Sequence, residues 1–585
     1  MGGCLSAENA AIVRFSPRMA IPATKAECCV TSPATSSRSE LTSHMIRERK
    51  HHNVWDYYQL IRLLGEGSIG EVNLVRRKKG TEGGSAYQTK KGFVHHLFGC
   101  CSRMILNDVE RNASPSVSMH SEEYALKCIQ LRLVQKSYLD ELRNEIEVLR
   151  SLDHPNIVKA YEVYETPRNI YVLMEYCSGG DLYARAPYTE NAAASLMAQL
   201  ASAIAHMHKH NVVHRDLKCE NIMFESKEDP MARIKVLDFG LSKKFLPGMS
   251  KVMTEGVGTV RDYVHDDMSL TIKTFISDQT LRLFYFTSAL YNGTAGLSSQ
   301  KKPFASKTRS QTKAKIMKCK YSFDTEEWKS ISALAKDFIA SLLVFEPTDR
   351  LSAKQALEHS WLKNNAAAES ETSAEFKRQI SLMNHVHDRI LGYSSMSELR
   401  RIASVVVAHK SSAAEILDIR KAFENFDKEK DGVITIDEFK AAFSQFNYTE
   451  EEMNKMFSNL DVNGCNEITY TEFIAATLDL HGRIEEKRLA EAFDLMDDDD
   501  SGYISKEDLI KLLGKSVSTD RIDALIQQAD FDGDGRISFA DFLEMFRVDN
   551  CKCANESMGL GSSSQSASIG TSTSEVNGLL EMNRS

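Results

Sequence analysis

The chain has 585 residues, 42% of them hydrophobic and 26% charged, and its formal net charge is −9. At about 150 residues per domain this length exceeds a single small module, and the composition is ordinary for a globular protein. No stretch approaches the roughly 18 uninterrupted apolar residues of a membrane-spanning helix, so any membrane contact must come from an anchor. The 12 cysteines include no C-x-x-C pair, and the N-terminus has no secretory signal. We therefore expect a reducing compartment and no disulfide framework.

The charge is distributed unevenly along the chain. Residues 411–550 contain 15 Lys and Arg against 33 Asp and Glu, a net charge of −18, whereas the remaining residues carry +9. An acidic module joined to a basic body favours cation binding and argues against nucleic acid as a partner.

Composition and periodicity divide the chain into regions. The first is rich in Ala, Ser and Thr and lacks periodicity, so we expect disorder until globular sequence starts near Trp55. The second mixes β-like runs such as EVNLV and IYVLMEY with helical stretches such as 189–210, which indicates a two-layered α/β enzyme body. The predicted regions are a leader with an acylation signal (1–55), the enzyme body (56–362), a helix-prone junction (363–415), four acidic loops in two pairs (416–548) and a disordered tail (549–585).

The N-terminal sequence MGGCLS matches the M-G-x-x-x-[ST] signature of N-myristoylation. Gly2 would carry myristate and Cys4 would carry palmitate. Two acyl chains anchor a protein stably where one does not, so we expect a peripheral, lipid-anchored protein on the cytoplasmic face of a membrane, partly cytoplasmic.

Five motifs of the enzyme body occur in a fixed order. The glycine-rich run LGEGSIGEV (64–72) lets backbone approach phosphates without a Cβ in the way, although alone it is more often a plain hairpin. YALKCI supplies Lys127, and HPNIV (154–158) follows a helix that contains Glu145. HRDLKCEN (214–221) and DFG (238–240) follow. The four motifs that follow the glycine-rich run are very unlikely to occur in this order by chance.

The acidic loops fit the EF-hand pattern, in which oxygens at positions 1, 3, 5, 7 and 12 surround Ca²⁺ and position 6 makes a sharp turn. Their position-6 residues recur at a period of 33 to 36 residues. The second loop has a neutral thiol, Cys465, at position 5 and Asn466 at position 6, so we expect it to bind Ca²⁺ most weakly. The third and fourth loops end in the shorter carboxylates Asp508 and Asp541, which favours lower affinity or competition by Mg²⁺. The predicted ligands are Asp427, Glu429, Asp431, Val433 and Glu438; Asp461, Asn463, Cys465, Glu467 and Glu472; Asp497, Asp499, Ser501, Tyr503 and Asp508; and Asp530, Asp532, Asp534, Arg536 and Asp541.

With these motifs the chain resembles the eukaryotic protein kinases, and with the C-terminal loops it resembles the calcium-dependent protein kinases of plants and protists. The resemblance implies an α+β two-lobed protein kinase fold followed by an all-α, calmodulin-like EF-hand domain. It also implies ATP, Mg²⁺ and Ca²⁺ as cofactors and Ser/Thr residues of proteins as acceptors.

The resemblance also assigns roles to single residues. Lys127 would hold the α- and β-phosphates and pair with Glu145, Asp216 would orient the substrate hydroxyl, and Lys218 would neutralise the transferring phosphoryl group. Phosphoryl transfer is mostly positioning plus charge stabilisation, and these residue types supply both. Asn221 and Asp238 would hold Mg²⁺, and Met174 would be the gatekeeper. The nucleotide would contact Leu64, Gly65, Glu66, Gly67, Ser68, Ile69, Gly70, Glu71, Val72 and Lys127, and its adenine the backbone of Glu175 and Cys177.

Two further acidic residues bear on substrate choice. Asp181 and Glu220 match positions where basophilic kinases of this type hold arginines upstream of the phosphorylated residue. We therefore expect substrates with Arg-x-x-Ser/Thr sites, although two ordinary surface carboxylates would look the same.

Two segments depart from the family pattern. Residues 260–302 contain no A-P-E and no D-x-W, although Glu255, at the position of a phosphorylated threonine, could mimic phosphate toward Arg215. Residues 80–121 are an insertion where a tight turn is expected. The first segment is either a real variant, in which case the chain could be a Ca²⁺-sensing pseudokinase or scaffold, or a gene-model error.

The junction contains a predicted basic amphipathic helix over 393–410. Met396, Leu399, Ile402, Val405 and Val406 recur at helical spacing, and a calmodulin-like lobe grips such a helix. The resemblance implies autoinhibition by this helix. The string Arg401-x-x-Ser404 could occupy the substrate cleft or be phosphorylated. The leading interpretation is a Ca²⁺-activated, arginine-directed Ser/Thr protein kinase of calcium signalling.

Overall fold

The computed structural model describes most of the enzyme body, the junction and the EF-hand region. The described residues are 41, 45–50, 52–67, 70–78, 123–133, 136–185, 188–228, 233–240, 242–244, 311, 321–324, 326–329, 331–344, 349–367, 373–412, 415–478 and 486–547. The acylation signal, the insertion over 80–121, the segment 260–302 and the tail lie outside them.

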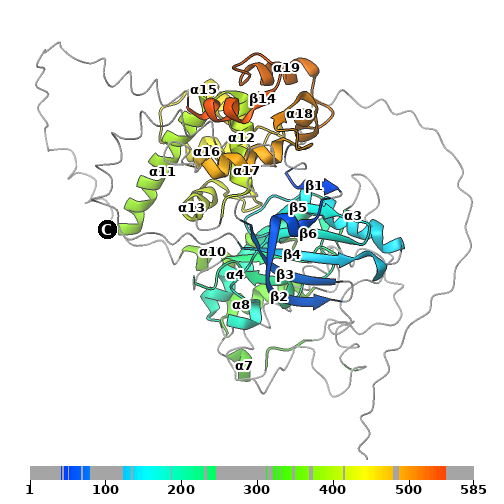
Figure 1. Cartoon of the computed structure of the whole chain (residues 1–585). Helices are drawn as coiled ribbons and strands as arrows, with labels where there is room; N and C mark the ends of the chain where they lie inside the picture. Colours follow the sequence, from blue (N-terminus) through cyan, green and yellow to red (C-terminus); the bar gives the residue numbers. More distant parts are fainter. Residues whose placement is uncertain are drawn as a thin grey trace, which may run out of the picture. The chain divides into compact units, whose positions relative to one another are not determined.

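The N-terminal lobe is built on a six-stranded sheet with the strand order β1-β5-β6-β4-β3-β2 (Figure 1). β1 pairs in parallel with β5, and all other neighbours are antiparallel. The short helix α1 (Val54–Tyr57) leads into the sheet, and α3 (Lys136–Arg150) follows β4 and the 3-10 turn η3 (Leu131–Leu133). The strands are β1 (Arg47–Lys50), β2 (Tyr58–Gly67), β3 (Gly70–Arg77), β4 (Glu123–Gln130), β5 (Ala160–Glu165) and β6 (Asn169–Glu175).

The prediction of a disordered leader as far as residue 55 is wrong for residues 47–50. These residues, RERK, form β1, in which Arg47 and Arg49 are 3% exposed while Glu48 and Lys50 point to solvent. A run of charges looks like a solvated segment in the sequence. Here the strand pairs with β5 and its two arginines find buried acidic partners, which compensate for their desolvation.

The C-terminal lobe is organised around α4 (Glu190–Lys209), close to the predicted 189–210. Thr189 caps this helix by accepting a hydrogen bond from the amide of Ala192, and most residues along it are buried. The hairpin β8 (Ile222–Phe224) and β9 (Ile234–Val236) follows the turn η5 (Cys219–Asn221). The other elements are η4 (Leu182–Arg185), β7 (Val212–Val213), β10 (Lys243–Lys244), α7 (Glu326–Lys329), α8 (Ala333–Leu342), α9 (Ala353–Leu357) and α10 (Ser360–Ala367).

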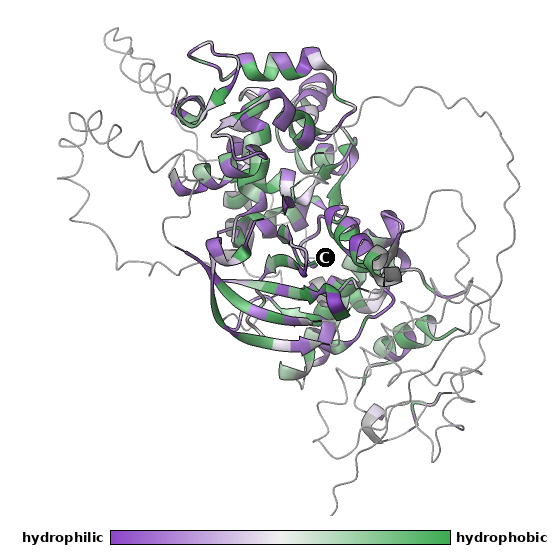
Figure 2. Cartoon of the chain, turned by 45° about the vertical axis from the view of Figure 1, so that its right-hand side comes forward, coloured by the Kyte–Doolittle hydropathy of each residue, from purple (hydrophilic) through white to green (hydrophobic). Residues whose placement is uncertain are grey.

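The remaining described elements form the junction and the EF-hands. Short strands pair the loops two by two, β11 with β12 and β13 with β14. Figure 2 shows apolar and polar residues interleaved on these helices, and the apolar ones form a single core with the junction. The elements are α11 (Ser373–Ser394), α12 (Glu398–His409), α13 (Leu417–Phe426), β11 (Val433–Ile434), α14 (Ile436–Ala442), α15 (Glu450–Leu460), β12 (Ile468–Thr469), α16 (Tyr470–Thr477), α17 (Glu486–Met496), β13 (Tyr503–Ile504), α18 (Lys506–Leu513), α19 (Thr519–Gln527) and β14 (Ile537–Ser538).

Candidate active site and calcium-binding loops

Lys127 lies between two carboxylates. Its Nζ is 2.7 Å from Glu145 Oε1 on α3 and 3.3 Å from Asp238 Oδ1 after β9. Burial alone would lower the pKa of Lys127, but the two carboxylates outweigh burial and raise it, so this cation stays charged. Burial would likewise raise the pKa of Asp238, yet Lys127 holds it below its ordinary value. Three groups that the sequence spreads over 112 positions therefore form one charged cluster.

The catalytic-loop residues also converge. Lys218 Nζ is 2.8 Å from Asp216 Oδ2, and Asn221 Nδ2 donates to the Asp216 carbonyl oxygen at 2.9 Å. Asp216 is 4% exposed, and Arg215 before it has a φ of +66°, which turns the backbone sharply at this point. His214 Nε2 lies 2.9 Å from the Leu237 carbonyl oxygen, so it ties this loop to the segment that carries Asp238.

The cluster has the donor set that Mg²⁺ prefers, since Asp216, Asn221 and Asp238 offer carboxylate and amide oxygens. Asp216 is close enough to Asp238 to affect its pKa. Bound Mg²⁺ would neutralise charge on the phosphate oxygens. Asn221 and Asp238 are the residues that would hold it.

The glycine-rich hairpin joins β2 to β3, with Gly67 opposite Gly70. A Cβ on Gly70 would lie 1.8 Å from the Cys128 carbonyl oxygen, so only glycine fits against β4 there. Ser68 and Ile69 at the tip lie outside the described residues, and Leu64, Gly65, Glu66, Glu71 and Val72 lie on the two strands.

β6 ends at the predicted adenine-binding residues. Glu175 is its last residue, and its amide donates to the Lys159 carbonyl oxygen at 2.9 Å. Its side chain lies 3.0 Å from Lys235 Nζ, and Lys235 is 2% exposed. Cys177 is buried, and burial raises the pKa of its thiol well above the ordinary value, so the thiol is neutral. The segment is therefore anchored by the Glu175 amide and by the side chains of Glu175 and Cys177.

Asp181 and Glu220 come from neighbouring elements, because the turn η4 contacts the turn η5. Glu220 is exposed, and Asp181 is partly exposed and accepts a hydrogen bond from the Ala184 amide at 3.0 Å. Both are available to an incoming cation. The activation segment, with Glu255, lies outside the described residues. Arg350, which the family pairs with the A-P-E glutamate, donates to the Val344 carbonyl oxygen.

The third and fourth EF-hand loops fit a divalent cation well. Each brings three carboxylates together with ligand atoms within 4.8 Å of one another, namely Asp497, Asp499 and Asp508, and Asp530, Asp532 and Asp534. Hard oxygen ligands gathered in a 12-residue loop are what Ca²⁺ requires.

The first and second loops differ from that arrangement. Glu429, predicted as a ligand at position 3, forms an ion pair with Lys354 on α9 at 2.6 Å. In the second loop Cys465 Sγ lies 3.2 Å from the Glu467 carbonyl oxygen, and burial raises the pKa of this thiol to about 12, so it is not a thiolate ligand. At position 12, Glu438 and Glu472 each accept hydrogen bonds from amides of their own loops.

Both of these loops contact helix α4 of the C-terminal lobe. Ser202 Oγ donates to the Lys430 carbonyl oxygen at 2.6 Å, and His206 Nδ1 lies 3.0 Å from the Asp431 carbonyl oxygen. Lys209 Nζ is 2.9 Å from both Asp431 and Glu467, which belong to different loops. The sequence analysis missed these residues because no motif marks them.

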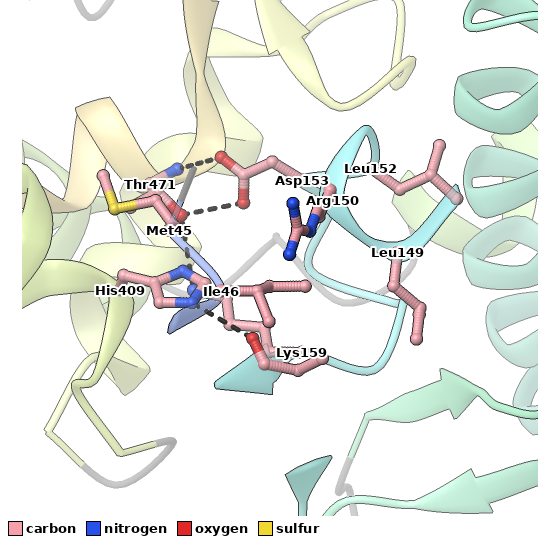
Figure 3. A pocket seen from close by; sticks show the side chains of 10 residues that line it. Met45, Ile46, Leu149, Arg150, Leu152, Asp153, Lys159, His409 and Thr471 are labelled. Carbon is pink, nitrogen blue, oxygen red and sulfur yellow. Dashed lines mark hydrogen bonds between the residues drawn. The ribbon is translucent and has the colours of Figure 1, made fainter. Parts of the chain in front are cut away.

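A small cavity lies nearby, where Asp153 points toward Thr471 of the second loop (Figure 3). Asp153 accepts from the Thr471 amide at 2.7 Å and from its hydroxyl at 2.8 Å. Lys159 lines the same cavity, and burial lowers its pKa. His409, the last residue of α12, has Nε2 3.3 Å from the Ala160 carbonyl oxygen. The lining is thus shared by the kinase, the junction and the second EF-hand.

The predicted junction helix is observed as α12 with Ser397 as its N-cap, but it is shorter than the predicted 393–410, because Tyr393 and Ser394 end α11 and a turn precedes Glu398. It contacts α16, α17 and α19, and its apolar positions are buried. Ser404 is 0% exposed and donates to the Arg400 carbonyl oxygen at 2.8 Å. Ser404 is therefore inaccessible to a kinase in this arrangement.

These features define a class of protein, a protein kinase fused to a calcium sensor. A family model described as protein kinase domain matches residues 116–362, and one described as EF-hand domain pair matches 416–478 and 486–547. None of the described helices has the length and apolar character of a transmembrane span.

Curated relatives of the chain are calcium-dependent protein kinases. The chain is 31% identical over 447 residues to calcium-dependent protein kinase 8 of Arabidopsis thaliana, covering 73% of this chain and 78% of that one. It is 32% identical over 447 residues to calcium-dependent protein kinase 9 of the same plant, covering 73% and 77%. It is 31% identical over 438 residues to calcium-dependent protein kinase 3 of Oryza sativa subsp. japonica, covering 73% and 76%.

The chain belongs to the calcium-dependent protein kinase family. It is a Ca²⁺-regulated Ser/Thr protein kinase that uses ATP and Mg²⁺, acts on protein substrates and binds Ca²⁺ through its EF-hands. The predicted fold class, family and cofactors are confirmed.

Proposed function

We propose that this chain is a catalytically active kinase directed to Arg-x-x-Ser/Thr sites, and not a pseudokinase. The observation that carries the proposal is the 2.7 Å ion pair between Lys127 and Glu145 beside Asp238. Phosphoryl transfer needs this pair and the metal-binding aspartate together. A chain that had lost catalysis would have no need to keep Lys127 within hydrogen-bonding distance of both Glu145 and Asp238.

Phosphorylation of an Arg-x-x-Ser peptide at saturating Ca²⁺ tests the proposal. The unmutated protein transfers phosphate, Asp216→Ala abolishes transfer while retaining Mg-ATP binding, and Asp238→Ala loses both transfer and the metal-dependent part of ATP binding. If the unmutated protein binds Mg-ATP but transfers no phosphate, the pseudokinase alternative that segment 260–302 raises is correct.

Arginine selectivity rests on Asp181 and Glu220, which lie on contacting turns and are both accessible. Glu220→Gln and Asp181→Asn should lower kcat/KM for the arginine peptide and leave kcat/KM for a matched peptide with alanine at that position unchanged. Asn can still accept the hydrogen bond from Ala184, so local structure is retained. Glu228→Gln, at an exposed carboxylate of the same lobe, is the control. Equal losses on both peptides would contradict arginine recognition.

Regulation by the junction helix is the next part of the proposal. At low Ca²⁺ the 393–410 segment blocks the substrate cleft, and Ca²⁺ makes an EF-hand groove bind it instead. The burial of Leu399, Ile402 and Val406 against EF-hand helices supports the second half of this cycle. A protein ending at Ala367, where α10 ends, should be active without Ca²⁺. If it melts like a folded kinase and stays inactive, the junction is not the inhibitor.

Membrane attachment is proposed from Gly2 and Cys4. Myristate alone binds membranes marginally, so stable attachment needs the palmitate on Cys4 as well. Gly2→Ala and Cys4→Ser should both move the protein from the membrane fraction to the supernatant, whereas Gly3→Ala should not. Unchanged fractionation of Gly2→Ala would mean that another segment holds the protein at the membrane.

A further inference from the structure

Arg420 on α13 is a sensor residue whose guanidinium contacts the kinase. It is 1% exposed, and its two Nη atoms donate to the two carboxylate oxygens of Glu225, at 2.6 and 3.0 Å. Its Nε donates to the Tyr470 hydroxyl at 3.0 Å, which fixes the plane of the guanidinium. A planar, bidentate arrangement of this kind determines orientation as well as distance.

Glu225 follows β8 directly and is tied to the segment after β6. Its carbonyl oxygen accepts from the Ser178 amide at 3.1 Å, one residue beyond Cys177. Its carboxylate lies 3.6 Å from Lys235 Nζ. Glu225 therefore contacts Ser178, the residue that follows the predicted adenine-binding segment, through its backbone, and its side chain lies beside Lys235.

Lys235 connects Glu225 to Glu175, the last residue of β6. Its Nζ is 3.0 Å from Glu175 Oε2, and the same carboxylate oxygen accepts from the Lys159 amide at 3.3 Å. Arg420, Glu225, Lys235 and Glu175 thus form an alternating row of charges, of which Arg420 and Lys235 are almost completely buried. The carboxyl of Glu225 resists protonation, because Lys235 and Arg420 outweigh the effect of burial and lower its pKa.

The charges in this row depend on one another. Each buried cation is compensated by carboxylates of the row, so removing Arg420 leaves Glu225 with Lys235 as its nearest cation. Glu225 then competes with Glu175 for Lys235. A change at the sensor is in this way passed to the last residue of β6 without any contact between the sensor and the nucleotide.

We propose that Arg420 is a positioning residue through which the docked calcium sensor sets the ATP-binding segment at Glu175–Cys177. It acts through Glu225 and Lys235 and contacts neither ATP nor the protein substrate. The proposal rests on the expectation that the backbone of Glu175 and Cys177 meets adenine. It predicts that sensor docking changes the affinity for ATP and not only access of the protein substrate.

The test measures kcat and the KM for ATP of the full chain at saturating Ca²⁺ and peptide, together with the Kd of a fluorescent ATP analogue. Arg420→Gln should raise KM and Kd by about five- to tenfold, in the usual range of coupling between sites, and leave kcat at saturating ATP unchanged. Lys421→Gln is the matched control, because Lys421 is the next residue on α13 and is exposed. It should change neither constant.

A variant of Glu225, the partner of Arg420 on the kinase domain, distinguishes loss of this ion pair from loss of folding. Glu225→Gln should raise the KM for ATP by a similar factor, and the double variant should be no worse than either single one, because both break the same link. Arg420→Lys, which keeps the charge and loses the bidentate geometry, should lie in between. Multiplied effects in the double variant, or an unchanged KM in Arg420→Gln with a native melting curve, would overturn the proposal.

The two proposals fail in different ways. If the chain were a pseudokinase, no phosphate would be transferred, yet the Kd of the ATP analogue would still report the effect of Arg420. If Arg420 had only a structural role, Arg420→Gln would lower the melting temperature while the Kd measured on the folded fraction equalled that of the unmutated protein.

Discussion

Arg47 Nη2 donates to the main-chain carbonyl oxygen of Asp497 at 2.8 Å, across 450 positions of sequence. The same guanidinium donates to the Asp494 carbonyl oxygen and lies 2.9 Å from Asp500 Oδ1. These carbonyls stand at the C-terminal end of α17, where helix carbonyls lack intrahelical partners and the helix dipole favours a cation. A strand preceding the kinase domain therefore caps the helix that leads into the third calcium loop.

Arg47→Gln should loosen this helix end. Hydrogen bonds to charged groups contribute about 1.5–3 kcal/mol, so the amides of residues 494–500 should exchange with solvent roughly 10- to 100-fold faster. Mass-spectrometric hydrogen exchange without Ca²⁺ measures this change. Lys50→Gln, in the same strand with a side chain that is 64% exposed, should leave exchange unchanged. Equal exchange in both variants would show that Arg47 does not hold the helix end.

Gly432 at position 6 of the first loop combines a left-handed backbone conformation with a tight contact. Its φ is +83°, and an added Cβ would lie 2.2 Å from His154 Cδ2 on the kinase. Gly432→Ala should therefore impair both the loop and its contact with the kinase. Gly535→Ala is a matched control, since Gly535 has φ +81°, the same loop position and open space around it.

Both glycine variants should lose about 1–2 kcal/mol to left-handed backbone strain. Only Gly432→Ala should also speed hydrogen exchange in α4 and lower maximal Ca²⁺-stimulated activity. If Gly535→Ala alters α4 to the same extent, the effect comes from the EF-hand and not from the contact.

The second loop should contribute least to Ca²⁺ activation. The second loop has Cys465 at position 5, and burial raises the pKa of this thiol to about 12, so this ligand position carries no charge before Ca²⁺ arrives. Glu438→Gln should raise the Ca²⁺ concentration for half-maximal activity more than Glu472→Gln does. Cys465→Asp should lower it, because a carboxylate replaces the thiol. A larger shift for Glu472→Gln in the activity titration would contradict this ranking.

His154 should make stability depend on pH. It is 1% exposed, and its Nδ1 accepts from the Asn156 amide at 3.0 Å, so the ring is neutral. Burial, aided by Lys235 and Arg233, lowers its pKa to about 3. Because this value is below the ordinary 6.5, its contribution is complete above pH 6.5 and is lost as pH falls toward 3, at about 1.4 kcal/mol per unit.

The melting temperature at pH 7.5, 6.5 and 5.5 without Ca²⁺ tests this dependence. His154→Gln should melt lower at pH 7.5 but show a shallower fall with acid, so the two curves should approach each other. His385→Gln, at an exposed histidine, should follow the unmutated protein. Parallel curves for His154→Gln would mean that this ring does not resist protonation.

The sequence by itself was sufficient wherever the chemistry is local. An EF-hand loop holds its ligands within 12 residues, and the kinase motifs place Lys127, Asp216 and Asp238 in short segments whose residue types phosphoryl transfer requires. The helix over 393–410 was predictable because apolar spacing records which face is buried. These features depend on hydrogen bonds and side chains a few positions apart.

Only the tertiary structure decided which distant charges meet. Arg420 and Glu225 are separated by 195 residues, and Arg47 and Asp500 by 453, and no pattern within either segment identifies its partner. For the same reason the RERK strand was wrongly assigned to a disordered leader, and the ion pair between Glu429 and Lys354 was not predicted. A charge in a sequence is expected to be solvated, and only a partner brought close by folding can compensate for its burial.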